Sequence, residues 1–253
     1  MFRPRVIPVL LLQGNGLVKS IQFKNHSYIG DPINAVKIFN EFKADELVFL
    51  DILASKENRL ISLDFVRDVG EEANMPFAVG GGIKTVKDIQ DVIASGAEKV
   101  IISSAAIRNP NFIKEASVTF GSSTIVVCID VKKNFLGGER VWSLNGSKVS
   151  KYKPEEFAEL MQKNGAGEII IQSITNDGEM NGYNISLIKK ISNQVKIPVV
   201  ALGGAGNIND LKEVYNDGYA NGLAAGSLFV YQNKMRGVLI NYPEKKVIKK
   251  IYL

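Results

Sequence analysis

Short apolar runs recur along the chain and alternate with longer amphipathic stretches. The runs are rich in β-branched residues and are apolar at both alternating positions, which is typical of strands buried on both faces. We predict strands at 5–12, 46–51, 76–80, 98–102, 124–130, 168–173, 197–202 and 220–224. The stretches between them begin at Asp, Thr, Lys-Pro or Asn and mostly end at glycine, which are common boundary residues of helices.

This alternation of strand and helix predicts the fold class. Repeated strand-helix units favour an α/β protein with a parallel sheet. Eight such units in 253 residues favour a closed sheet, so we predict a single (β/α)8 TIM barrel domain over 1–253. An open, doubly wound sheet is the alternative that the pattern leaves.

The chain also repeats itself. Residues 75–107 align with 197–229 without a gap, and the same shift places 43–52 on 165–174. A period of about 120 residues is half of an eight-unit barrel. We therefore predict two similar half-barrels, at about 1–120 and 121–253, with two equivalent sites.

Composition narrows the possible chemistry. Cys128 is the one cysteine and His26 the one histidine, which excludes an internal disulfide and a multi-histidine zinc site, and indicates a cytoplasmic setting. The net charge of +5 is scattered along the chain, which favours anionic metabolites over nucleic acid. The longest apolar stretch, 6–12, is too short to span a membrane. The carboxylates are dispersed over different strand-helix units, so we predict no metal site.

Two glycine turns are candidate phosphate sites. VGGGI at 79–83 is followed one unit later by Ser103-Ser104-Ala105, and LGGAG at 202–206 by Ala225-Gly226-Ser227. Glycine lets main-chain N–H groups approach an anion, and small residues leave space for it. One such turn alone is more often a tight strand-helix connection. Two copies predict a ligand with two anionic ends at the barrel mouth.

These turns belong to a wider set of motifs that resembles a known family. Together with SSAAIRNP at 103–110, NDGEMNGY at 176–183, GDP at 30–32 and ELVFLDI at 46–52, they resemble HisF, the cyclase subunit of imidazole glycerol phosphate synthase, over essentially the whole chain. The resemblance implies a (β/α)8 barrel that needs no cofactor and receives ammonia from a HisH-like glutamine amidotransferase. The standard enzyme, a lyase-type synthase, cyclises a bisphosphorylated ribulosyl intermediate to imidazole glycerol phosphate and aminoimidazole carboxamide ribotide.

The resemblance also implies which residues hold the two substrate phosphates. One phosphate would lie on Gly82, Ser103 and Ser104. The other would lie on Asp177, Gly178, Gly204, Ala225 and Gly226. The family usually has asparagine at the position of Ser103, and serine keeps a donor there but shortens its reach.

Four charged residues stand at the beginnings of predicted strands, hence on the N-terminal face of the barrel. They are Arg5, Glu46, Lys99 and Glu168. Their positions alone are equally compatible with a stabilising ion-pair cluster, because that face of a barrel usually serves stability. The resemblance implies a gate where ammonia enters from the amidotransferase.

The catalytic carboxylates are where the chain departs from the family. The family ends its first and fifth strands with aspartates that act as general acid and general base. The fifth-strand residue is Asp130, but Leu11 replaces the first aspartate. Lys19 and His26 lie in the stretch between the first strand and first helix, which we predict to be a lid loop with Lys19 catalytic. Asp51 ends the second strand, as a structural residue or one that assists Lys19.

We therefore expect an ammonia-accepting HisF-like paralogue that serves the amidation of N-acetyl sugars for surface polysaccharides. The alternative is a working cyclase of histidine biosynthesis in which another group replaces the lost acid. A third possibility is the related sugar isomerase of histidine synthesis, which works alone. A non-catalytic binding or scaffold subunit is the fourth.

Overall fold

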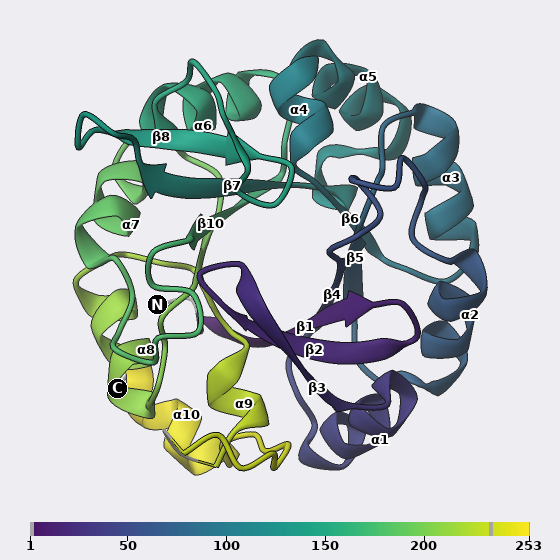
Figure 1. Cartoon of the computed structure of the whole chain (residues 1–253), viewed down its shortest axis with the longest axis vertical. Helices are drawn as coiled ribbons and strands as arrows, with labels where there is room; N and C mark the ends of the chain where they lie inside the picture. The colour runs from purple at the N-terminus through teal and green to yellow at the C-terminus, as the bar shows by residue number, and fades with distance from the viewer. Residues whose placement is uncertain (1–2, 233–234, 253) are drawn as a thin grey trace.

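The computed structural model describes residues 3–232 and 235–252. Eight parallel strands close into a barrel that is surrounded by helices (Figure 1). In order around the barrel they are β1 (Arg5–Gln13), β4 (Leu47–Asp51), β5 (Phe77–Gly80), β6 (Lys99–Ile102), β7 (Ile125–Lys133), β10 (Glu168–Ser173), β11 (Val199–Leu202) and β12 (Gly222–Ala225). Pairing of β12 with β1 closes the barrel. The predicted (β/α)8 fold is confirmed, and the open sheet is wrong.

Strand residues alternate between two apolar layers. On β1, Leu10 and Leu12 face the helices, whereas Val9 and Leu11 fill the barrel interior. Each fully buried aliphatic side chain contributes about 1.5–3 kcal/mol relative to an exposed one. Burial on both faces explains why the strands read as continuous apolar runs in the sequence.

The helices cover the outside of the barrel. Several begin at the predicted boundary residues: Asp31 caps the first helix, and Thr85 and Asn207 form capping boxes with Asp88 and Asp210. These caps satisfy main-chain N–H groups that a helix leaves without partners. The helices are α1 (Pro32–Phe42), α2 (Leu63–Glu72), α3 (Val86–Ala94), α4 (Ser104–Arg108), α5 (Asn111–Phe120), η1 (Ser122–Thr124), α6 (Pro154–Lys163), α7 (Ile185–Ser192), α8 (Ile208–Asn216), α9 (Ser227–Val230) and α10 (Lys245–Tyr252).

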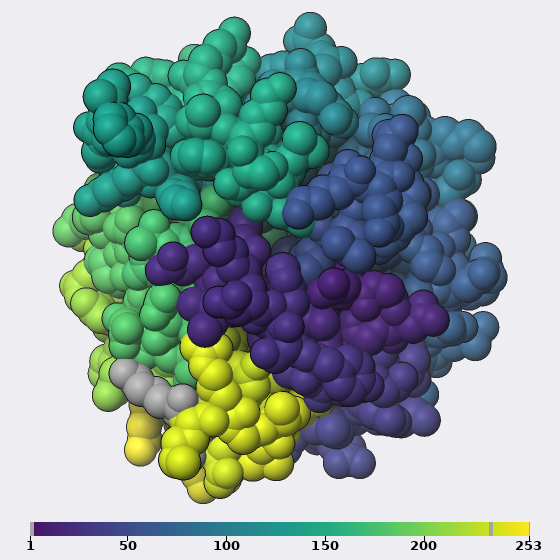
Figure 2. All heavy atoms as spheres, viewed as in Figure 1, coloured from purple at the N-terminus to yellow at the C-terminus, as the bar shows by residue number. Residues whose placement is uncertain are grey.

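Two antiparallel hairpins extend from the barrel on the side of its carboxyl strand ends. β1 continues into β2 (Gly16–Ile21) and β3 (Lys24–Gly30), so the predicted lid loop is in fact a hairpin. β7 continues into β8 (Glu139–Ser143) and β9 (Lys148–Val149). In the space-filling view, the purple N-terminal segment lies over the centre of the barrel (Figure 2). The hairpins therefore wall the barrel mouth.

The two hairpins occupy corresponding places in the chain. β1 and β7 are nine residues each, and each is followed by an antiparallel excursion. The capping boxes of α3 and α8 also lie in the aligned repeats. These similarities agree with a two-half organisation, although the half-barrel boundaries stay a prediction.

Candidate active site

Two adjoining cavities open at the carboxyl ends of the strands. Leu11, Ser20 and Gln172 line both of them. Of the predicted phosphate residues, Gly82, Ser103 and Ser104 line the larger cavity. Asp177, Gly178, Gly204, Ala225 and Gly226 line the smaller one. The barrel thus brings the two predicted groups to neighbouring cavities.

The larger cavity contains an unsatisfied hydroxyl. Ser103 Oγ is buried and has no hydrogen-bond partner among the described residues. Ser104 Oγ, by contrast, accepts a hydrogen bond from the Leu144 N–H at 3.1 Å. Because buried polar atoms are nearly always paired, Ser103 is a candidate ligand-binding group.

Gly82 is required by the close approach of a neighbouring turn. Its φ is +72°, and a Cβ atom there would lie 1.8 Å from the Arg59 carbonyl oxygen. Only glycine fits both the angle and the space. The glycine turn is therefore pressed against the segment that follows β4.

That segment and two others supply a group of positively charged residues that the sequence analysis missed. Lys56, Arg59, Lys84 and Arg108 line the larger cavity, against the acidic Asp51 and Asp130. This excess of positive charge favours an anionic ligand. The sequence signal was too diffuse to find it, because these basic residues come from three different segments.

Asp51 is a structural residue. Its carboxylate accepts hydrogen bonds from the Leu53 and Ala54 N–H groups, both at 3.0 Å. The Arg59 guanidinium donates to both of its oxygens, at 2.5 and 3.2 Å. The proposed assistance to Lys19 is wrong, because Asp51 is held by Arg59 and lines only the larger cavity.

Lys19 is buried at the smaller cavity. Its Nζ donates to the Val9 carbonyl at 2.6 Å. A Cβ atom on Gly226 would lie 2.3 Å from that nitrogen, so the ammonium lies beside the second predicted phosphate turn. Burial lowers the pKa of Lys19 to about 8, and nearby Asp177 opposes this shift. Lys19 is thus placed to neutralise an anion.

Asp177 joins the first hairpin to the turn after β10. Ser20 Oγ donates to its carboxylate at 2.8 Å, and Gln172 Nε2 donates at 3.4 Å. The Gln22 N–H donates to its main-chain carbonyl at 2.9 Å. Burial raises the pKa of Asp177, and the hydrogen bonds from Ser20 and Gln172 and the charge of Lys19 oppose the increase. The β2–β3 hairpin is therefore docked over the smaller cavity.

Asp130 is the acid-base candidate of the larger cavity. It ends the inward-facing row of β7, is 9% exposed, and lies opposite Gln172 in the sheet. Burial raises the pKa of Asp130 to about 7, and the charge of Asp177 adds to this increase. A hydrogen bond from the Cys128 thiol, whose Sγ lies 3.6 Å from Asp130 Oδ1, opposes the increase. A carboxyl group with this pKa can give or take a proton near neutral pH.

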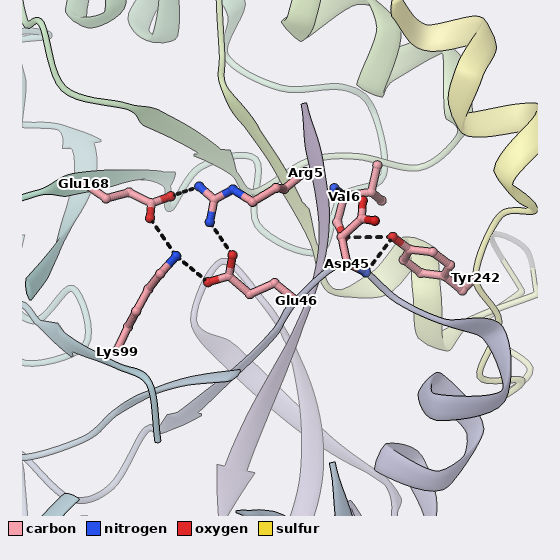
Figure 3. Close-up of polar contacts among 7 residues, drawn as sticks. All are labelled: Arg5, Val6, Asp45, Glu46, Lys99, Glu168 and Tyr242. Carbon is pink, nitrogen blue, oxygen red and sulfur yellow. Dashed lines mark hydrogen bonds and ion pairs between the residues drawn. The ribbon is translucent and has the colours of Figure 1, made fainter. Parts of the chain in front are cut away.

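The four predicted charges on the opposite face form a closed ring (Figure 3). Arg5 donates to both Glu46 and Glu168, and Lys99 Nζ bonds the same two carboxylates at 2.9 and 3.1 Å. Burial opposes the charge of Arg5, but the two carboxylates outweigh it and raise its pKa. Three of the four begin β1, β6 and β10, and Glu46 directly precedes β4. The ring covers the N-terminal end of the barrel interior.

Comparison with known proteins identifies the family. Residues 5–236 match the family described as histidine biosynthesis protein. The chain is 48% identical to a Leptospira borgpetersenii protein, over 96% of each chain, that is provisionally named imidazole glycerol phosphate synthase subunit HisF. The chain belongs to the HisF family.

Other relatives have similar names. The chain is 44% identical to a Pseudomonas aeruginosa protein provisionally named imidazole glycerol phosphate synthase subunit hisF2, over 96% of this chain and 97% of that one. It is 42% identical to a Petrotoga mobilis protein named imidazole glycerol phosphate synthase subunit HisF, over 91% and 92%. The HisF likeness therefore extends over almost the whole chain.

Leu11 is the residue that we predict to replace the first aspartate of the HisF pattern. It faces the barrel interior, is 8% exposed and lines both cavities. Its sheet neighbours are Leu50 on β4 and Val18 on β2. An alkyl side chain therefore occupies the place between the two candidate phosphate turns.

The described residues give no indication of a metal site or a membrane span. In the part of the chain that the structure describes, no group of three or more His, Cys, Asp or Glu side chains is arranged to hold a metal ion. Within residues 3–232 and 235–252, no helix is both long and apolar enough to cross a bilayer. His26, in the first hairpin, lines the larger cavity of this HisF barrel.

Proposed function

We propose that this HisF-family barrel takes ammonia from a HisH-like glutamine amidotransferase and serves the amidation of an N-acetyl sugar instead of histidine synthesis. Leu11 carries this proposal, because it leaves Asp130 without its acidic counterpart between the two cavities. A missing general acid or base lowers a rate about 10²- to 10⁴-fold. The other site residues expected from the HisF pattern are present in the sequence, except that Ser103 stands where the family usually has asparagine.

The ring is the proposed point of ammonia entry, with the amidotransferase docked on the N-terminal face. Between the ring and the cavities the barrel interior is apolar, with small residues such as Ala78 and Ala224. Neutral ammonia crosses such an interior at far lower cost than the ammonium ion. This lining supports delivery of ammonia to the cavities.

The two cavities are the proposed sites of an anionic substrate. Gly82, Ser103 and Ser104 would hold one anionic group with main-chain and hydroxyl donors. Asp177, Gly178, Gly204, Ala225 and Gly226 would surround the other. Lys19 would neutralise that second group, because its ammonium lies against Gly226. We therefore assign Lys19 to binding and keep Asp130 as the proton-transfer residue.

Neither remaining aspartate near the mouth replaces the lost acid. Asp51 is held by Arg59, and Asp177 is held by Ser20 and Gln172. The numbered names of two relatives, hisF2 in Pseudomonas aeruginosa and hisF3 in Vibrio vulnificus, add support for a paralogue. The charged ring and Leu11 also argue against the related sugar isomerase. That enzyme has both aspartates of the HisF pattern and works without an amidotransferase.

A cyclisation assay tests the proposal. The purified protein is given an ammonium salt and the ribulosyl bisphosphate intermediate, and the loss of substrate absorbance is followed. We expect turnover at least about 100-fold below that of a HisF with both aspartates. Turnover within about tenfold of that HisF would contradict the amidation proposal and favour the cyclase of histidine biosynthesis.

A further inference from the structure

The start of β1, which carries Arg5, is not paired at the ring with Glu46 and the start of β4. The β1–β4 ladder runs only from Val9↔Val48 to Leu12↔Asp51. Before Val9, β1 pairs with β12 on its other side. The ladder therefore does not set the distance between Arg5 and Glu46.

A tyrosine from the C-terminal segment bridges this gap (Figure 3). The Tyr242 hydroxyl donates to the Val6 carbonyl at 3.0 Å and accepts from the Asp45 N–H at 3.2 Å. The Val6 N–H donates to the Asp45 carboxylate at 3.0 Å. Val6 and Asp45 directly adjoin Arg5 and Glu46, so this cycle of hydrogen bonds joins the two backbones beside the ring.

Tyr242 is itself held firmly. It is 6% exposed, and its ring packs against Phe39 at a centroid distance of 6.4 Å and Phe229 at 5.6 Å. Burial raises the pKa of its hydroxyl, which therefore stays protonated and keeps its donor. A buried hydroxyl that uses both its donor and its acceptor specifies geometry as well as stability.

We propose that Tyr242 is a positioning residue of the ring: through Val6 and Asp45, its hydroxyl fixes the separation of Arg5 and Glu46. Arg5 holds both carboxylates, so a shift of β1 relative to β4 would loosen the contact between Arg5 and Glu46. The consequence for ammonia entry rests on the proposed function, whereas the positioning itself does not.

The test follows Arg5 by NMR in the full chain labelled with 15N-arginine, with its signal assigned by Arg5→Lys. In the natural protein, hydrogen bonds to two different carboxylates should keep the Arg5 Nη groups distinct and slow to exchange. Tyr242→Phe retains the aromatic packing and removes both hydrogen bonds of the hydroxyl, while the direct bond from the Val6 N–H to the Asp45 carboxylate remains. We expect the Arg5 Nη signals to merge, or their solvent exchange to rise about two- to tenfold, as for the loss of one hydrogen bond.

Tyr183→Phe is the matched control. Tyr183 is also buried and also donates to a main-chain carbonyl, that of Ala224 at 2.9 Å, but it follows β10 at the other end of the barrel. It should leave the Arg5 signals unchanged. Asp45→Asn, which weakens the bond from the Val6 N–H and the ion pair of Asp45 with Arg3, should change them in the same direction as Tyr242→Phe.

Unchanged Arg5 signals in Tyr242→Phe, or an equal change in Tyr183→Phe, would overturn the positioning role. The measurement needs neither the amidotransferase nor a substrate. Its failure would therefore leave the proposed function standing. Failure of an amidotransferase to bind would instead contradict that function and leave the Tyr242 result intact.

Discussion

Replacement of Asp130 by asparagine should stabilise the protein at neutral and alkaline pH. Burial raises the pKa of Asp130 from 3.8 to about 7, so the folded state holds a proton that the unfolded state has released between those values. This stabilising contribution is complete below pH 3.8 and is lost as the pH rises through 7. Each pH unit in that window costs about 1.4 kcal/mol, which gives about 4 kcal/mol in all.

Urea denaturation of the natural protein and Asp130→Asn at pH 5, 6, 7 and 8 measures this difference. The free energy of unfolding of Asp130→Asn should exceed that of the natural protein by an amount that grows with pH and levels off above 7. Asp64→Asn is the control, because Asp64 is exposed and pairs with Arg67 at the surface. A difference for Asp130→Asn that does not change with pH would refute the burial argument and its assignment as the proton-transfer group.

Three further substitutions test the cavities and the ring. Ser103→Ala should change the free energy of unfolding by no more than about 0.5 kcal/mol, because the Ser103 hydroxyl has no hydrogen-bond partner among the described residues. It should nevertheless weaken the binding of inorganic phosphate several-fold, as measured by calorimetry. Unchanged binding would exclude Ser103 from the site. Gly82→Ala should lower the free energy of unfolding in urea by about 2 kcal/mol or more, since the added Cβ would meet the Arg59 carbonyl oxygen. An unchanged free energy of unfolding would contradict the close approach of this turn. Arg5→Met should cost about 2–4 kcal/mol in urea denaturation, because Lys99 alone would face two buried carboxylates; no loss would show that the ring is not stabilising.

The barrel could be predicted because its strands are buried on both faces. A strand such as β10, Glu168–Ser173, reads as an unbroken apolar run from Ile169 to Ile171 and has one interpretation. The hairpins could not be predicted in this way. Five of the seven residues of β3 are exposed and polar or aromatic. Its sequence therefore lacks the alternation of apolar and polar residues that distinguishes a strand from a loop.

The candidate site could be predicted only in part, because some of its residues act through contacts that the sequence pattern does not reveal. The glycine turns and the four ring charges follow from their places at strand ends. The roles of Arg59 and Tyr242 follow instead from contacts with distant residues, Arg59 against Gly82 and Tyr242 against Val6. Lys19 shows the same limit, since only the folded hairpin reveals that it is buried beside Gly226.

The most direct test of the account is the cyclisation rate of Leu11→Asp with ammonium salt and the ribulosyl bisphosphate intermediate. Residue 11 lines both cavities, so an aspartate there would restore the second proton-transfer group opposite Asp130. We predict a rate at least about 100-fold above that of the natural protein, with Leu11→Asn as slow as the natural protein because an amide transfers no proton. Equal rates for Leu11→Asp and the natural protein would contradict the claim that Leu11 removes the cyclase chemistry from this barrel.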